Sequence, residues 1–330
     1  MFVRTVLGDI DARQLGVCYA HEHVIIDRSF TTHVEPELCL DSVDLACEEL
    51  TAFYQAGGRA MVDTMPCHSG RNVRKLAEVS RRTGVHIVCP TGLHLQKYYP
   101  PGHWSLTLDA DELAELFIAD IELGVDANDY GGPQVRRTGH KAGVIKVAGG
   151  RDHLSEQEQK TFKAAATAHL QTGCPIITHT QEGTAALEQI DILGKAGVEL
   201  EHVVLSHTDR LPDIELHRSL LRSGVRLEYD GAFRWQPPGP NHTLELVAAL
   251  LPEFPNQLML GMDAARRRYW RSYGGAPGLT YLLEDFSGQL RGAGLDDGMI
   301  DRLFVHNPAE LFRFVAVSQP QTLQRRAELS

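Results

Sequence analysis

The chain has 330 residues, of which 43% are hydrophobic and 23% are charged, and its formal net charge is −11. This acidic balance argues against a nucleic-acid partner, because such proteins carry a basic surface. No apolar run approaches the roughly 18 residues of a membrane span, and the start of the chain lacks the apolar core of a signal peptide. The six cysteines form no C-x-x-C pair, so we expect them to be reduced and the protein to be cytoplasmic.

Short apolar runs rich in Val and Ile recur along the chain, with helical patterns between them. The runs cover residues 17–26, 60–65, 86–89, 143–147, 175–179, 203–207, 225–229 and 258–263. Helical periodicity is found in segments that include 41–55, 72–82, 156–170 and 184–193. Strands that alternate with helices pair in parallel, and eight of them close a barrel. We therefore predict an α/β fold, a (β/α)8 TIM barrel that forms a single domain over residues 1–330, with a short N-terminal extension (1–16) and a polar C-terminal tail (316–330).

The first run ends in the motif Ala20-His21-Glu22-His23. Side chains alternate along a strand, so His21 and His23 should point the same way and Glu22 the other way. Two imidazoles on one face can bind one metal ion. For this motif alone, a pair of hydrogen-bonded core histidines is an equal alternative.

Other polar residues end or interrupt later runs, where a charge or an imidazole is costly to bury. They are Lys146 in the fourth run, His179 in the fifth, His207 in the sixth and Asp263 in the eighth. Singly, each has an ordinary alternative: a core histidine, a helix cap for Asp263, or a salt-bridged lysine. Because functional groups of such barrels lie at the carboxyl ends of the strands, the set together predicts a metal site there.

The chain resembles the phosphotriesterase-related branch of the amidohydrolase superfamily, including its phosphotriesterase-like lactonases, over nearly its whole length. The motifs that carry the resemblance are Ala20-His21-Glu22-His23, Ala142-Gly143-Val144-Ile145-Lys146, Thr178-His179-Thr180, Ser206-His207-Thr208-Asp209, Gly261-Met262-Asp263 and Asn307-Pro308. The resemblance implies a binuclear metal centre. It assigns His21, His23 and Asp263 to a buried ion, His179 and His207 to a more exposed ion, and Lys146, as a carbamate, to both.

Imidazole and carboxylate ligands suit zinc, with manganese or cobalt as alternatives. Burial should lower the pKa of Lys146 and free its amine to add carbon dioxide. By the same resemblance, a hydroxide shared by the ions is the nucleophile. Asp263 is then the catalytic residue that takes its proton and passes it to the leaving group.

Two positions depart from the best-known members of the family. Organophosphate-cleaving members have a relay histidine after the seventh strand, where this chain has Gly231. Quorum-sensing lactonases have a tyrosine after the third strand, where this chain has His94. Neither a tuned phosphotriesterase nor an acyl-homoserine lactonase is therefore the best match.

The loops expected at the barrel mouth are rich in cations and aromatic side chains. Arg266 and Tyr269 are three residues apart, so one helical turn would place both on the same face. Their placement resembles that of phosphate-binding residues in family members that act on phosphorylated sugar lactones, and arginine suits a bidentate phosphate contact. The further substrate-binding candidates are Arg234, His94 and Tyr98. Solvated helix-face side chains are the preferred interpretation of Arg267, Arg268 and Arg271.

These observations predict a metal-dependent hydrolase that opens a small anionic lactone, with a phosphorylated sugar lactone as the preferred substrate. A phosphotriesterase or phosphoesterase, or a hydrolase of N-acyl amides, is the alternative on the same site. A metal-free binding barrel is disfavoured, because it would have no use for a lysine and an aspartate at these strand ends. The expected partner is a small-molecule substrate, and the resemblance suggests a homodimer.

Overall fold

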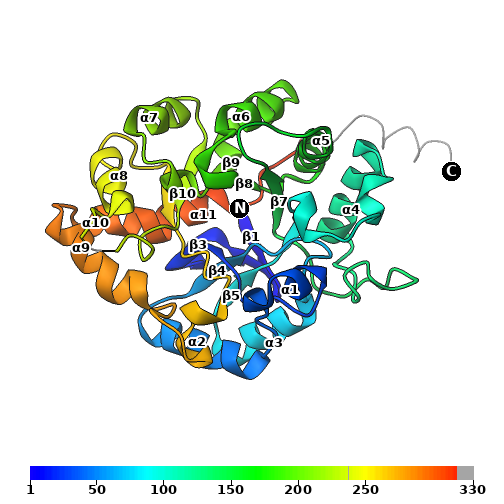
Figure 1. Ribbon diagram of the computed structural model, residues 1–330, viewed down its shortest axis with the longest axis horizontal. Helices are drawn as coiled ribbons and strands as arrows, with labels where there is room; N and C mark the ends of the chain where they lie inside the picture. Colours follow the sequence, from blue (N-terminus) through cyan, green and yellow to red (C-terminus); the bar gives the residue numbers. More distant parts are fainter. Residues whose placement is uncertain (237, 318–330) are drawn as a thin grey trace.

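Strands lie at the centre of the molecule, and helices surround them (Figure 1). The computed structural model describes residues 1–236 and 238–317. Within them, the barrel strands are β3 (Cys18–Glu22), β4 (Ala60–Asp63), β5 (His86–Val88), β6 (Pro90–Gly92), β7 (Val144–Gly149), β8 (Ile176–Thr180), β9 (Val203–Ser206), β10 (Arg226–Tyr229) and β11 (Leu258–Leu260). β5 matches the third predicted run, and β6 continues the same barrel strand beyond Cys89, so each predicted run contributes one strand to the barrel.

All neighbouring barrel strands pair in parallel, in the orders β3-β4-β5 and β6-β7-β8-β9-β10-β11. The ring closes between β11 and β3, where the Asp263 N–H donates to the His21 carbonyl at 3.0 Å. The Met262 N–H also donates to Glu22 Oε1 at 2.7 Å. The (β/α)8 TIM barrel predicted from the alternation of strands and helices is confirmed.

Helices follow the strands around the barrel, and many begin at a side chain that caps their free N–H groups. They are α1 (Phe30–Val34), α2 (Val43–Gln55), α3 (Val73–Thr83), α4 (Ala110–Glu122), α5 (Glu156–Thr172), α6 (Ala186–Lys195), α7 (Ile214–Arg222), α8 (His242–Leu250), α9 (Ser287–Gly292), α10 (Asp297–Asp301) and α11 (Asn307–Leu311). The four predicted helices match α2, α3, α5 and α6 within two residues at each end. Ser42, for example, accepts from the Leu45 N–H at 3.3 Å and sets the start of α2.

The amino end of the barrel is closed by both ends of the described chain. The predicted N-terminal extension forms an antiparallel hairpin of β1 (Phe2–Thr5) and β2 (Gly8–Asp11). Val3 of this hairpin packs with Leu311 and Phe312 against small and branched side chains of the barrel interior. The cavity that concerns function therefore lies at the carboxyl end. Most of the predicted C-terminal tail lies outside the described residues.

Among the helices in the described part of the chain, none combines the length and the apolar character that a membrane crossing requires.

Candidate metal centre and substrate cavity

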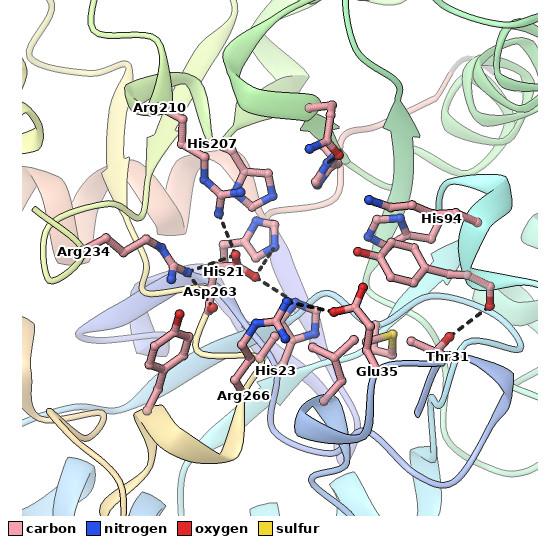
Figure 2. Close-up of a pocket in the computed structure, with 18 residues that line it drawn as sticks. His21, His23, Thr31, Glu35, His94, His207, Arg210, Arg234, Asp263 and Arg266 are labelled. Carbon is pink, nitrogen blue, oxygen red and sulfur yellow. Dashed lines mark hydrogen bonds and ion pairs between the residues drawn. The ribbon is translucent and has the colours of Figure 1, made fainter. Parts of the chain in front are cut away.

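A cavity of about 420 Å³ lies at the carboxyl ends of the barrel strands. Its lining includes five of the six predicted metal ligands and all five predicted substrate-binding residues: His21, His23, His179, His207 and Asp263, with Arg234, His94, Tyr98, Arg266 and Tyr269. Residues from distant parts of the sequence therefore converge on one site, as Figure 2 shows.

His21, His23 and Asp263 form the deepest group of this site. Oδ1 of Asp263 lies 3.1 Å from Nε2 of His23 and 3.9 Å from Nε2 of His21, so the three donors face one point. Glu22 points away, as strand alternation predicts, and accepts the Met262 and Ala264 N–H groups. β3 ends at Glu22 because Asp63 accepts the next free N–H groups, those of Val24 and Ile25.

His179 in β8 and His207, directly after the neighbouring strand β9, form a second pair. Their ring centres are 4.6 Å apart, and the His207 ring is 4.5 Å from that of His21. Nδ1 of His207 donates to Asp230, which leaves Nε2 free to face the cavity. Nε2 of His179 contacts Oε1 of Gln181 at 3.2 Å, which leaves Nδ1 available.

Lys146 reaches this group from β7 with only 1% of its surface exposed. Its Nζ lies 3.4 Å from Nε2 of His21. Burial lowers the pKa of Lys146 to about 8, in spite of the nearby carboxylates of Asp263 and Glu228. Gly92 of β6 allows β6 to pair closely with β7, because a Cβ atom at this position would lie 1.9 Å from the Lys146 carbonyl oxygen.

The charge states of these residues fit a divalent ion. Burial lowers the pKa of His21, His179 and His207, so each ring is neutral, as a metal ligand must be. Nδ1 of both His21 and His23 has no hydrogen-bond partner within the described residues. Burial raises the pKa of Asp263, but its contact with His23 and the charges of Arg210 and Arg234 outweigh this effect and hold the pKa well below its ordinary value. Neutral imidazoles around an ionised carboxylate are a donor set for zinc and similar metals.

Buried carboxylates stand behind two of the histidines. Asp230 contacts His207, and Oε2 of Glu228 lies 3.5 Å from Nδ1 of His21. Glu228 is fully buried, and burial raises its pKa well above the ordinary value. Asp230 fixes which ring nitrogen of His207 faces the metal site, whereas Glu228 lies near His21 without a hydrogen bond to it. The two acids were not predicted as site residues, although two carboxylates in the apolar run Glu228-Tyr229-Asp230 are a usable signal.

The predicted substrate-binding residues line the outer part of the cavity, but neighbouring groups contact several of them. Arg266 Nη2 lies 2.8 Å from Oε2 of Glu35. Arg234 donates to Oδ2 of Asp263 at 3.1 Å and stacks 5.2 Å from the Tyr269 ring centre. Arg266 precedes the short 3-10 turn Arg267–Tyr269 and is itself extended, so the shared cavity, and not a common helical face, brings Arg266 and Tyr269 together.

His94 and Tyr98 form the opposite wall of the cavity. Their rings are 4.4 Å apart, and His94 is 5.1 Å from His179. Burial lowers the pKa of His94, so that ring is neutral.

Sequence reasoning missed three charged residues of this cavity: Glu35, Lys97 and Arg210. Lys97 lies over the Tyr98 ring at 5.0 Å. Arg210 follows His207 by three residues, and a charge so close to a buried strand end was a usable signal. Glu35 gave no such signal in the sequence, because it lies in an ordinary polar loop.

Comparisons with known proteins agree with this geometry. The model of the Phosphotriesterase family matches residues 1–312. A phospho-furanose lactonase of Mycoplasmopsis agalactiae is 31% identical, covering 95% of this chain and 92% of that protein.

Two solved structures are similar throughout. One is a lactonase from Listeria monocytogenes, with a TM-score of 0.86 and 29% identity over 96% of this chain and 100% of that one. The other is the phosphotriesterase homology protein from Escherichia coli with phosphate in its active site, with a TM-score of 0.83 and 30% identity over 91% and 99%. The chain thus belongs to the Phosphotriesterase family and is a metal-dependent hydrolase.

Proposed function

We propose that this protein is a lactonase that opens the ring of a small phosphorylated sugar lactone. The observation that carries the proposal is that one cavity holds both a metal-ligand set and an outer group of cations, Lys97, Arg234 and Arg266. A neutral triester or an acyl chain would have no use for these cations, whereas arginine and lysine both bind phosphate. The relative named as a phospho-furanose lactonase supports this choice.

In this proposal, His21, His23 and Asp263 hold one divalent ion, and His179 and His207 hold a second. Zinc suits these ligands, with manganese and cobalt as alternatives. The ions would supply polarisation of the lactone carbonyl and acidification of a water molecule. Lys146 would bind both ions as a carbamate, because its buried amine has a lowered pKa and a carbamate provides the anionic oxygens that an amine lacks.

The protein's own residues then bind the substrate, orient it and move a proton. Arg266, Tyr269 and Lys97 would hold the phosphate at the mouth, while the ring carbonyl reaches the deeper histidines. Water adds to the carbonyl carbon, the ring C–O bond breaks, and Asp263 passes one proton from the water to the ring oxygen. The product is a hydroxy acid, whose carboxyl group releases one proton to the solvent at neutral pH.

We further propose a single catalytic domain, a homodimer and a cytoplasmic location. All six cysteines are buried and free, which suits a reducing compartment.

The released proton provides the test. A pH-indicator assay would compare phosphorylated furanose lactones with their dephosphorylated forms, a paraoxon-like triester and an N-acyl amide of a small acid. We expect the phosphorylated lactones to have the highest kcat/KM, by at least about tenfold over their neutral forms, as one charge-assisted contact provides. Faster turnover of the triester or the amide than of any lactone would reject the proposal in favour of those activities.

A further inference from the structure

Arg210 occupies a position that the ligand set alone does not explain. It ends the short turn Thr208–Arg210 that follows β9, and it lines the cavity. A single nitrogen, Nη2, donates to Oδ2 of Asp263 at 2.7 Å and to Oδ1 of Asp230 at 2.9 Å. Figure 2 shows the guanidinium group directed at Asp263 from the side of His207.

The two carboxylates that Arg210 joins serve different halves of the metal centre. Asp263 turns its other oxygen, Oδ1, toward His23 and His21. Asp230 turns its other oxygen, Oδ2, toward Nδ1 of His207. One guanidinium group therefore connects the His21–His23 pair at the end of β3 with His207, directly after β9, through one carboxylate on each side.

The contact of Arg210 with Asp263 also determines which carboxylate oxygen of Asp263 is free to bind a metal ion. Oδ2 receives N–H groups from Arg210 and from Arg234, so Oδ1 is the oxygen presented to the histidines. Arginine keeps its charge at all accessible pH values, so this arrangement does not switch off by deprotonation. Asp230 is fully buried and Asp263 has an 18% exposed side chain. Removing the guanidinium would leave Oδ1 of Asp230 without its side-chain donor in a low-dielectric setting and Oδ2 of Asp263 with Arg234 alone.

The loop after β10 also supplies Arg234, which donates to Oδ2 of Asp263 at 3.1 Å, but its Nε lies 3.9 Å from Oδ1 of Asp230, too far for a hydrogen bond. Gly231 follows Asp230, but a Cβ atom there would lie 2.7 Å from Oδ2 of Asp209 and 2.9 Å from Oγ1 of Thr243. No side chain can enter from that position without displacing buried groups. Within the described residues, Arg210 is therefore the arginine that hydrogen-bonds to both Asp230 and Asp263.

We propose that Arg210 is a positioning residue of the metal centre, because it bridges Asp230 and Asp263. Through Asp263 it keeps Oδ1 directed toward the His21–His23 pair, and through Asp230 it fixes the orientation of the His207 ring. Its role is to orient two ligands and not to bind the substrate.

The test is spectroscopic, so that it does not depend on the proposed lactone substrate. The apoprotein is loaded with Co²⁺, whose visible absorption reports the geometry of its ligands. In Arg210→Ala, we expect an altered Co²⁺ spectrum and Co²⁺ binding weakened by roughly 10- to 150-fold, the effect of losing a charge-assisted contact. Methylguanidinium in the buffer should restore both. Arg210→Lys, which keeps a donor and the charge, should lie between wild type and Arg210→Ala, and it carries the test if the alanine variant does not fold.

Arg218→Ala is the matched control. It removes a guanidinium group from α7, where Arg218 pairs with Glu215 and Glu253 at the surface. Its Co²⁺ spectrum should equal that of wild type. A wild-type spectrum and Co²⁺ affinity in Arg210→Ala would overturn the proposal, as would changes that neither methylguanidinium nor lysine reverses.

Kinetics on the best substrate found give a second, independent criterion. A positioning role predicts a fall in kcat with KM changed less than about threefold, because the lost interaction acts on the reacting groups and not on substrate binding. A rise in KM alone would make Arg210 a substrate contact and overturn the assignment. If no lactone is turned over, the proposed function fails, while the Co²⁺ result still decides the role of Arg210.

Discussion

Lys146 projects a buried amine into a group of histidines, and that amine has a pKa of about 8. This setting makes the residue chemically unusual, since the neutral amine can react with carbon dioxide near physiological pH. We expect Lys146→Ala to lose most of its activity and one or both metal ions, because the anionic bridge is gone.

A short carboxylic acid added to the buffer should restore part of the activity of Lys146→Ala by supplying the missing oxygens. Metal analysis and lactone turnover with and without the acid provide the measurement, with wild type plus acid as the control. Full activity of Lys146→Ala without any additive would exclude a bridging role.

Arg266 lies at the mouth of the cavity and is paired with Glu35. A phosphate contact of this kind contributes about 1.5–3 kcal/mol, so Arg266→Ala should lower kcat/KM for a phosphorylated lactone by roughly 10- to 150-fold. The loss should appear mainly in KM, since the phosphate is held alike before and during the reaction. Turnover of a neutral lactone should hardly change.

Arg271→Ala supplies the comparison for Arg266→Ala. Arg271 belongs to the same loop but does not line the cavity and pairs with Glu284. Its kinetics should match wild type on both lactones. Equal losses on the charged and the neutral lactone in Arg266→Ala would show a structural arginine instead of a substrate contact.

At the residue scale, the candidate ligands stood out in the sequence because each ends or interrupts an apolar run, where a polar side chain is costly to bury. The pairs that organise them could not be predicted. Arg210 meets Asp263 across 53 positions of sequence, and Arg266 meets Glu35 across 231. Such contacts depend on the three-dimensional closure of the barrel, which leaves no local pattern in the sequence.

Among the elements, the third barrel strand shows the largest difference from the sequence expectation. The predicted run ended at Cys89, but β6 continues to Gly92 and pairs with β7. The sequence Thr91-Gly92 has no apolar pattern that would predict a strand. The extension exists because Gly92 can approach Lys146 with φ at +101°, a conformation that glycine tolerates and other residues rarely adopt.

Gly92→Ala should therefore be strongly destabilising. The new Cβ would meet backbone atoms of Lys146 at 1.9 Å, so strands β6 and β7 would have to separate. We expect a loss above about 3 kcal/mol in the free energy of unfolding, beyond the roughly 1–3 kcal/mol of an unfavourable backbone conformation alone. Denaturant unfolding provides the measurement.

Gly102→Ala separates the two causes. Gly102 also has a positive φ, +75°, but a Cβ atom added there would have no other atom within 4 Å. Gly102→Ala should lower the free energy of unfolding only by the roughly 1–3 kcal/mol of the unfavourable backbone conformation. Similar stability of the two variants would show that the close approach of β6 to Lys146 is unimportant.

On the scale of the whole molecule, the alternation of strands and helices was enough to predict the barrel, because eight parallel strands have few other ways to bury both faces. The loop packing around it was not predictable. His68 and His103, for example, are 35 residues apart, yet Nδ1 of His68 lies 2.8 Å from Nε2 of His103. Nothing in either segment indicates that the two rings meet.

This histidine pair makes stability depend on pH. Burial lowers the pKa of His103 to about 4 and also lowers that of His68. The unfolded chain binds protons near pH 6.5, before the folded protein does, so unfolding becomes easier as the pH falls from about 6.5 toward 4.

Unfolding curves between pH 7.5 and 4 would measure this dependence in wild type and in His103→Gln, which cannot take up a proton. The variant should lose less stability on acidification than wild type over that range. Parallel pH profiles for the two proteins would show that His103 titrates normally in the folded state.

The most direct test of the whole account is a metal titration of the chelator-treated protein, followed by elemental analysis and lactone hydrolysis at each point. Two groups of ligands, one at β3 and β11 and the other at β8 and β9, predict that hydrolysis returns with added zinc and is complete near two ions per chain. His21→Ala and Asp263→Ala should remain inactive throughout the titration. Full activity in protein that holds no metal would contradict the account.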